Sequence, residues 1–487
     1  MAGGDDLPVL RTVELFSGIG GMRHALEAAL GGGGAGGARR FMLDVVASVD
    51  VHAGANAAYR HTFGPSSSPV AVDLATVDAS FFDALGPVDL WTLSPPCQPY
   101  TSLGLRADAA DPRAAALNRL VVLLPRLAHP PHRILLENVR NFECSASRDA
   151  LVAALAAMGY ACQEFLLSPT ALGIPNDRLR YYLLARRIAA VGPFSHPQWD
   201  AHPCSRRPDG AALADDAEAG VPANASGRSK RARDNDSEGR GQHRLLAFIP
   251  GREGSQARAE ALAEAEAGLK RRERARMAEA LRRRGQGDGD GDVDLELGGS
   301  EGEREWRVAH PMSEVPGYEM FEDVNAKRAA LYAHCRPVSD FLEPGSDLAG
   351  DAMPEGLRTY LVPDSILAKF KAYVFDVVGP EDRRSSCFTS SYGKFLRGTG
   401  SLLAPDFHGP GGGQERVLKA HNGDPPLEAL RSLCLRYFTP GEVAALMGFP
   451  RSLSFPPSFG RKQQWKLLGQ SLHVTVVAAL ADYLFVD

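Results

Sequence analysis

The chain has 487 residues, of which 44% are hydrophobic, so it is long enough for two or three domains with sizeable cores. Its net charge of −5 excludes a strongly basic protein, so any nucleic-acid binding must come from local basic patches. The seven cysteines form no C-x-x-C pair or zinc-type cluster, and no segment has the roughly 18 uninterrupted apolar residues of a membrane span. We therefore expect no metal and no membrane association, and a reducing compartment, the cytoplasm or the nucleus.

Residues 9 to about 190 alternate short apolar segments with helix-like stretches. The strand-like segments are 9–15, 45–50, 70–74, 88–93, 133–137 and 179–185, and the stretches 22–30 and 149–158 have helical character. This alternation predicts an α/β fold, a parallel sheet with helices on both faces. Ligands of such sheets bind outside the carboxyl ends of the strands.

Residues 200–305 have a different composition, because Gly, Ala, Arg, Asp and Glu dominate and large apolar residues are sparse. The composition predicts a low-complexity, disordered insertion. An RNA-contacting arm is the alternative, since residues 270–284 are rich in arginine, and KRAR at 230–233 could be a nuclear localisation signal. Order is expected to resume at 306, and the chain ends with a predicted apolar helix at 474–484.

A glycine-rich turn, FSGIGG at 16–21, follows the first strand and precedes a helix. Its glycines let backbone N–H groups approach a ligand, although the turn matches neither G-x-G-x-x-G nor a phosphate loop. Asp50 ends the next strand, where a carboxylate can bind ribose hydroxyls, and Val51 could pack on an adenine ring. Asp73 ends the third strand-like segment; Asp50 and Asp73 could equally be ordinary strand-end residues.

Cys97 lies in the segment SPPCQP at 94–99, just beyond the fourth strand-like segment. Its two consecutive prolines restrict φ and stiffen the loop. A lone cysteine is usually buried and inert, but a rigid polar loop at the ligand-facing edge favours a nucleophile. Glu137 ends the fifth segment, and Arg178 and Arg180 alternate onto one face before the last one. Each could be a surface ion-pairing residue, yet together a thiol, an acid and two cations at one edge indicate a site.

These segments resemble, in order, the signature motifs of cytosine-C5 methyltransferases: FSGIGG (16–21), PPCQ (95–98), ENV (137–139), RLR (178–180) and GQSL (469–472). Further segments are similar to the tRNA(Asp) cytosine methyltransferases: GIPNDRLRY (173–181), CFT (387–389), RYFTP (436–440) and LMGFP (446–450). The resemblance covers about 9–190 and 330–487. It implies a Rossmann-like methyltransferase sheet in a catalytic domain (9–190), a smaller target-recognition region (306–435), and a closing segment (436–487) that completes the catalytic domain.

The resemblance also implies S-adenosylmethionine as the methyl donor. The cofactor-binding residues that it implies are Phe16, Ile19, Gly20, Gly21, Asp50, Val51, Asp73, Leu74, Ser94 and Ser471. Where the family usually has Asn in its closing motif, this chain has Gln470, and we expect a modest change in cofactor affinity.

In the implied mechanism, the Cys97 thiolate adds to C6 of cytosine. Arg178 and Arg180 lower the pKa of this thiol and help to hold the base, and Glu137 hydrogen-bonds N3 and the exocyclic amine. The implied substrate is a tRNA anticodon-loop cytosine, at position 38 of tRNA(Asp), because loop bases are already unstacked and cheaper to flip. The candidate phosphate-binding residues are Arg383, Arg384, Lys394, Arg397, Arg461, Lys462 and Lys466.

Two alternatives remain open from the sequence. The first is a DNA cytosine methyltransferase with the same chemistry, against which the CFT segment at 387–389 argues. The second is a catalytically silent nucleic-acid-binding relative, against which the intact Cys97, Glu137, Arg178 and Arg180 argue.

Overall fold

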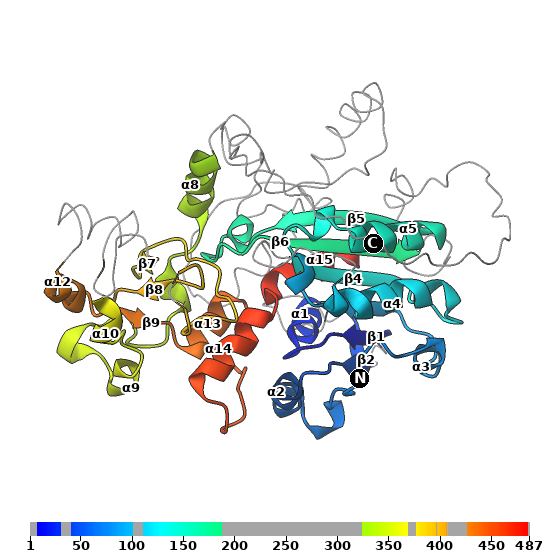
Figure 1. Cartoon of the computed structure of the whole chain (residues 1–487), viewed down its shortest axis with the longest axis horizontal. Coiled ribbons are helices and arrows are strands. Elements are labelled where there is room, and N and C mark those ends of the chain that lie inside the picture. The colour runs from blue at the N-terminus through cyan, green and yellow to red at the C-terminus, as the bar shows by residue number, and fades with distance from the viewer. Residues whose placement is uncertain are drawn as a thin grey trace, which may run out of the picture.

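A computed structural model of the chain describes residues 7–30, 40–100, 111–187, 324–368, 376–395, 397–405, 407 and 426–485. The predicted insertion at 200–305, with its candidate localisation signal at 230–233, lies outside these residues, as does the predicted boundary at 306. The described residues form two parts that lie side by side, a large sheet flanked by helices and a smaller region of short elements (Figure 1).

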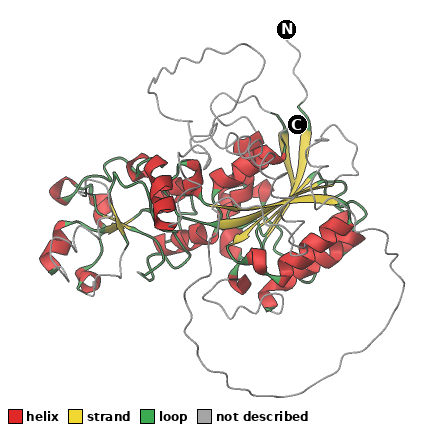
Figure 2. Ribbon diagram, turned by 90° about the horizontal axis from the view of Figure 1, so that it is seen from above, coloured by secondary structure: helices red, strands yellow, loops and turns green. Residues whose placement is uncertain are grey.

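The large part contains one six-stranded sheet with the order β2-β1-β3-β4-β6-β5. Its strands are β1 (Val9–Leu15), β2 (Met42–Val49), β3 (Leu90–Leu93), β4 (Arg133–Val139), β5 (Tyr160–Leu167) and β6 (Arg180–Arg187). Seen from above, the sheet lies between helices on its two sides (Figure 2). The predicted Rossmann-like α/β arrangement is therefore confirmed.

The sheet is mixed rather than wholly parallel. β1, β2, β3 and β4 pair in parallel, but β6 is antiparallel to both β4 and β5. The reason is the connection after β5, which contains only a single 3-10 turn, Pro169–Leu172, and no crossover helix. The strand predicted at 70–74 is also wrong, because only Val70 makes an isolated bridge, to Val49.

Strand β5 escaped the sequence prediction because polar residues interrupt its apolar pattern. Gln163 and Glu164 lie in the middle of the strand, yet both are buried. Glu164 accepts hydrogen bonds from Arg148 Nε (2.7 Å) and from the Tyr181 hydroxyl (2.6 Å). A buried carboxylate with partners of this kind is tolerated in a core, although its sequence signal is that of an exposed position.

The strands have apolar side chains on both faces, as expected for a sheet that helices cover on each side. On β6, Tyr182 and Leu184 pack in one hydrophobic cluster, and Tyr181 and Leu183 pack in the other. The first cluster includes side chains of α1 (Gly21–Leu30), α2 (Ala53–Phe63) and α15 (Val474–Leu484); the second includes those of α3 (Ala79–Asp83), α4 (Ala115–Leu123) and α5 (Ala146–Ala157).

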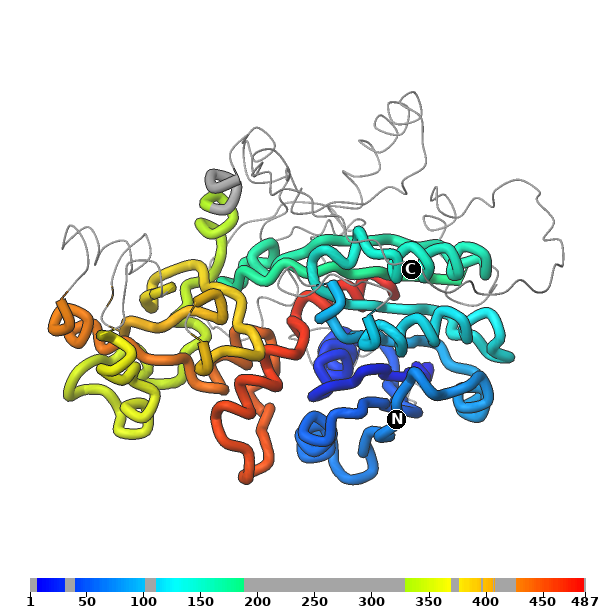
Figure 3. Tube along the Cα trace, viewed as in Figure 1, coloured from blue at the N-terminus to red at the C-terminus, as the bar shows by residue number. Residues whose placement is uncertain are grey.

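The smaller region has a three-stranded sheet of two-residue strands, β7 (Val377–Val378), β8 (Leu402–Leu403) and β9 (Arg436–Tyr437). Around it lie α8 (Val324–His334), α9 (Glu355–Arg358), α10 (Asp364–Leu367), α12 (Leu427–Ser432) and α13 (Pro440–Leu446). The chain then passes through α14 (Arg461–Gln470) into α15, which packs against α1 in the large part (Figure 3).

The segment Arg461–Leu484 spans α14 and α15. By length and composition alone, it is long and apolar enough to cross a membrane. Within it, 67% of the most apolar window is buried inside the protein. Its apolar character therefore matches the burial of its side chains in the core, where α14 packs against α13 and α15 against α1.

Candidate active site

Four strand ends bring the predicted catalytic residues to one edge of the sheet. The carboxyl ends of the parallel strands β1, β3 and β4 lie at this edge, and β6 begins there because it runs antiparallel. Arg180 pairs with Val139, two residues beyond Glu137. The sequence prediction that a thiol, an acid and the two arginines gather at one edge agrees with this topology.

The loop that carries Cys97 is tied to the sheet by backbone contacts. The Ser94 N–H donates to the Leu15 carbonyl (3.3 Å), and Asn138 Nδ2 donates to the Pro95 carbonyl (3.3 Å). After Cys97 the chain forms a 3-10 turn, in which the Tyr100 N–H donates to the Cys97 carbonyl (3.1 Å). These contacts hold the half-buried Cys97 at the edge between β1, β3 and β4.

The sequence predicted a lowered pKa for the Cys97 thiol, but the surroundings in the structure raise it. Burial raises the pKa of the Cys97 thiol above its ordinary value, and the carboxylate of Glu137 raises it further. Arg180 and Arg178 lower this pKa as expected, but their effect does not outweigh burial. In the free protein, Cys97 is therefore predominantly a thiol at neutral pH.

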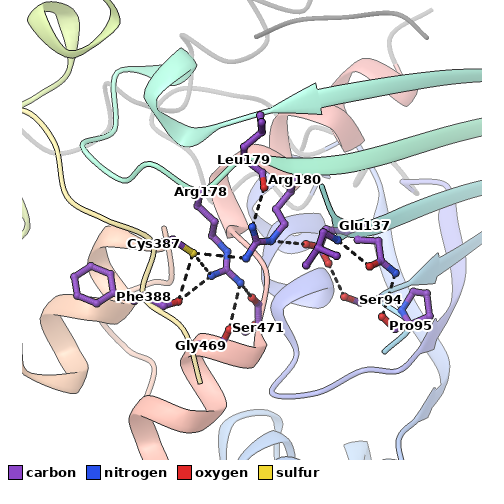
Figure 4. A network of polar contacts seen from close by, with 12 residues as sticks. Ser94, Pro95, Glu137, Arg178, Leu179, Arg180, Cys387, Phe388, Gly469 and Ser471 are labelled. Carbon is purple, nitrogen blue, oxygen red and sulfur yellow. Dashed lines mark hydrogen bonds and ion pairs between the residues drawn. The ribbon is translucent and has the colours of Figure 1, made fainter. Parts of the chain in front are cut away.

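Glu137 lies between Ser94 and Arg180 at the centre of the site (Figure 4). The Ser94 hydroxyl donates to Glu137 Oε2 (2.8 Å), and Arg180 Nε lies 3.6 Å from Glu137 Oε1. Only 7% of Glu137 is exposed, whereas Arg180 is half-buried. The three side chains form one polar chain that leads from the β3 loop to the start of β6.

Arg178 makes contacts that the sequence did not predict, since its guanidinium holds together segments of the backbone. It donates to the carbonyls of Phe388 (2.9 Å), Gly469 (3.4 Å) and Ser471, and it is only 3% exposed. These bonds join the start of β6 to the CFT segment and to the α14–α15 junction (Figure 4). Arg178 therefore makes its hydrogen bonds within the protein, and Arg180 is the arginine that faces Glu137.

Cys387 is a member of the site to which the sequence assigned no chemical role. Its sulfur accepts hydrogen bonds from Arg178 Nη1 (3.3 Å) and Arg180 Nη2 (3.6 Å). Burial alone would raise the pKa of the Cys387 thiol, but the charges and hydrogen bonds of these arginines bring it below its ordinary value. The signal was its position in the CFT segment, although nothing in the local sequence reveals a contact across more than 200 residues.

The glycine-rich turn after β1 adopts backbone conformations that favour glycine. Gly18 and Gly20 have φ of 56° and 83°, in the left-handed region. A Cβ atom on Gly20 would lie 2.3 Å from Phe63 Cε2, whereas one on Gly18 would meet no atom within 4 Å. The space beside Gly20 is therefore filled by protein atoms, whereas the space beside Gly18 is open.

Asp50 and Ser471 border this turn from two sides. Asp50 Oδ2 accepts the Gly18 N–H (2.8 Å), and its Oδ1 accepts the His52 N–H (2.7 Å). A carboxylate has about four acceptor positions, so Asp50 keeps capacity for ribose hydroxyls. The Ser471 hydroxyl would lie 3.0 Å from a Cβ atom on Gly21, which places the closing motif against the turn.

The residues present fit a bound S-adenosylmethionine. The Val51 side chain is 64% exposed beside Asp50, as an adenine-binding residue requires, and the buried Ser17 hydroxyl has no hydrogen-bond partner among the described residues. Of the other predicted contacts, Asp73 is exposed and Phe16 is half-buried, but the side chains of Ile19 and Leu74 are buried in the hydrophobic clusters. Ile19 and Leu74 can therefore offer only their backbone to a ligand.

The basic residues predicted to contact phosphates separate into two groups. Arg384 Nη2 lies 2.8 Å from Asp376 Oδ1, and Arg383 donates to the Cys335 carbonyl, so both are used within the protein. The remaining five are exposed: Lys394, Arg397, Arg461, Lys462 and Lys466; of these, Arg461 also donates to the Thr359 carbonyl. Among the described parts of the chain, no group of three or more His, Cys, Asp or Glu residues is arranged to hold a metal.

Comparison with known proteins agrees with this geometry. The family model of the C-5 cytosine-specific DNA methylases matches residues 10–205. A mouse tRNA (cytosine(38)-C(5))-methyltransferase is 32% identical over 98% of this chain and 93% of its own length. A Dictyostelium discoideum DNA (cytosine-5)-methyltransferase is 27% identical, over 98% of this chain and 94% of its own.

Among solved structures, the S. pombe Dnmt2 methyltransferase is similar over 98% of each chain, with a TM-score of 0.56 and 26% identity. These likenesses extend through both parts of the protein, and they include the segments that form the sheet edge. The chain therefore belongs to the cytosine-C5 methyltransferase family, in the branch of the tRNA (cytosine(38)-C(5))-methyltransferases.

Proposed function

We propose that this protein transfers a methyl group from S-adenosylmethionine to C5 of a cytosine in tRNA. The observation that carries the proposal is the single sheet edge at which the Cys97 loop, Glu137 and Arg180 meet beside the open glycine-rich turn. The tRNA methyltransferases that resemble the chain over nearly its full length support the choice of substrate.

The residues at the edge have separate tasks in this reaction. C5 of cytosine is a weak nucleophile, and addition of the Cys97 sulfur to C6 moves electron density onto C5. Glu137, held by Ser94 and Arg180, would accept a hydrogen bond from the exocyclic amine of the flipped base and, when protonated, donate one to N3. Loss of the C5 proton, once C5 carries the methyl group, restores the ring and releases Cys97.

The cofactor would bind along the turn after β1. Asp50 and Val51 would hold the ribose and the adenine, and Gly21 with Ser471 would border the methionine end. When bound, S-adenosylmethionine supplies an electrophilic methyl group. Arg178 keeps Ser471 in place for this purpose, because it donates to the Ser471 carbonyl.

The finer proposal is that the target is one anticodon-loop cytosine, position 38 of tRNA(Asp), and that a covalent Cys97–C6 adduct forms during turnover. A loop base is already unstacked, so flipping it costs less than flipping a base out of a duplex. The activity for which the mouse relative is named supports position 38.

The test is incubation of the full-length protein with labelled S-adenosylmethionine and separate pools of tRNA and duplex DNA. We expect label in tRNA, with one protected cytosine in the anticodon loop on bisulfite sequencing and no label from Cys97→Ala. A tRNA in which 5-fluorocytidine replaces the target should trap a covalent complex with the wild type only.

DNA methylation is the second candidate, since one similar protein is described as a DNA methyltransferase. Strong labelling of DNA with unlabelled tRNA would replace the tRNA proposal by this one and keep Cys97 as the nucleophile. Absence of transfer to either pool, with intact cofactor binding, would favour a silent nucleic-acid-binding protein.

A further inference from the structure

Phe395 is an exposed aromatic residue on a turn of the smaller region. Its side chain is 55% exposed, although phenylalanine is usually buried. The turn follows the CFT segment, and Lys394 Nζ lies 5.2 Å from the centre of the Phe395 ring. The proposed catalytic steps leave this aromatic side chain without a task.

The turn is anchored firmly, so the exposure of Phe395 does not come from a loose loop. The Phe395 N–H donates to the Ser391 carbonyl (3.1 Å), and the Thr399 hydroxyl donates to the Phe395 carbonyl (2.6 Å). The buried Tyr392 hydroxyl donates to the Ser401 carbonyl (2.7 Å) and accepts the Phe438 N–H (2.9 Å). The protein thus holds an apolar ring in water on a fixed support.

The support connects the turn to the catalytic residues and to helix α14. Phe388 packs edge-on against Tyr392, with ring centres 5.0 Å apart, and its carbonyl accepts from Arg178. On the other side, a Cβ atom on Gly393 would lie 2.5 Å from Trp465 of α14. Phe395 therefore lies on the same packed support as the CFT segment, whose backbone is bonded to Arg178 of the site.

The segment that carries the ring and the helix that supports it are basic. Residues 387–405 and 461–470 contain no acidic residue. The exposed cations on these two segments are Lys394, Arg397, Arg461, Lys462 and Lys466. A positive local surface on a chain of net charge −5 is complementary to a phosphate backbone.

We propose that Phe395 is a stacking platform for an unpaired base adjacent to the target cytosine, with Lys394 and Arg397 contacting the neighbouring phosphates. The inference rests on the proposed function and extends it from the reacting base to the nucleotides around it. Bases stack on aromatic rings irrespective of sequence, and an aromatic ring among cations is the usual form of a single-strand binding surface. A protein partner fits less well, because docking between proteins uses a contiguous apolar patch with few charges at its centre.

The test compares Phe395→Ala with Phe395→Trp, which keeps a stacking ring, and with Val122→Ala. Val122 is a similarly exposed apolar residue on α4, in the large part of the protein. We expect Phe395→Ala to raise the Kd and KM for tRNA about tenfold with little change in kcat, and the other two variants to resemble the wild type.

A second measurement identifies the contact. In an anticodon stem-loop with an abasic residue beside the target cytosine, at either flank in turn, wild-type affinity should fall at one flank. There Phe395→Ala should cause no further loss, because the two changes remove the same stacking contact. The dependence of binding on salt should be unchanged in Phe395→Ala and weaker in Lys394→Ala, since only the lysine contacts a phosphate.

Equal tRNA affinity and KM for wild type and Phe395→Ala would overturn the platform while tRNA methylation stands. Additive losses in the abasic stem-loops would also overturn it. Failure of the wild type to methylate tRNA would instead contradict the proposed function.

Discussion

The two parts of the protein are stabilised in different ways. In the large part, strands of up to eight residues bury apolar side chains on both faces of a sheet. In the smaller region the strands have two residues each around a small apolar cluster, and buried polar contacts do more to fix the chain. The guanidinium of Arg436 makes two hydrogen bonds to Glu442, and both side chains are fully buried. An apolar core tolerates small changes, whereas a buried ion pair requires both of its partners.

This difference explains which elements the sequence could predict. Val9–Leu15 and Val474–Leu484 are rich in apolar residues, and the structure has a strand and a helix with those same bounds. The smaller region has no such periodicity. Its hydrogen bonds join distant residues, for example Ser346 to Arg436 (3.2 Å), and local sequence contains no trace of them.

Breaking the buried ion pair should have the largest effect on stability. Arg436→Met would leave the Glu442 carboxylate buried without its cation, which costs about 3–5 kcal/mol of unfolding free energy. Arg358→Met is the control, because Arg358 forms an exposed ion pair with Glu355 and should cost at most about 1 kcal/mol. Urea unfolding followed by circular dichroism measures both, and equal losses would contradict the comparison.

The glycine-rich turn provides a second contrast within the large part. Gly20→Ala adds a Cβ atom against Phe63 in a left-handed conformation, so we expect a loss of about 2 kcal/mol or more and weaker cofactor binding. Gly18→Ala meets only the conformational cost, about 1 kcal/mol, because the space around it is open. Unfolding measured without cofactor compares the stability of the two variants. A larger loss of unfolding free energy for Gly18→Ala would contradict the assignment of Gly20 as the crowded position.

The same reasoning applies to the candidate site. The topology of β1, β3 and β4 places Cys97 and Glu137 at one edge, so their association could be predicted from strand order alone. The roles of Arg178 and Cys387 could not, because they depend on contacts with residues more than 200 positions away. Likewise, the balance between burial and nearby cations at Cys97 requires the folded structure.

That balance predicts how the activity depends on pH. The reactive form is the thiolate, and burial raises the pKa of Cys97, so kcat/KM should increase as pH rises. The increase, roughly tenfold per pH unit below the pKa, should continue beyond pH of about 8.5, where an ordinary cysteine would level off. A pH profile of kcat/KM tests this, with Cys97→Ala as the blank. A plateau that begins below pH of about 8 would show that the arginines outweigh burial.

The smallest effect is expected at Gln470, which lies at the junction between the two parts. Its side chain is exposed, and the contacts that hold the junction come from the neighbouring backbone, since Arg178 donates to the carbonyls of Gly469 and Ser471. Gln470→Asn restores the usual family residue, keeps the amide, and leaves those backbone bonds in place. We therefore expect unchanged unfolding free energy and a Kd for S-adenosylmethionine within about threefold of wild type, since exposed substitutions typically change free energies by less than about 0.5 kcal/mol. Isothermal titration calorimetry measures the Kd. A change of tenfold or more would mean that the Gln470 amide itself contacts the cofactor.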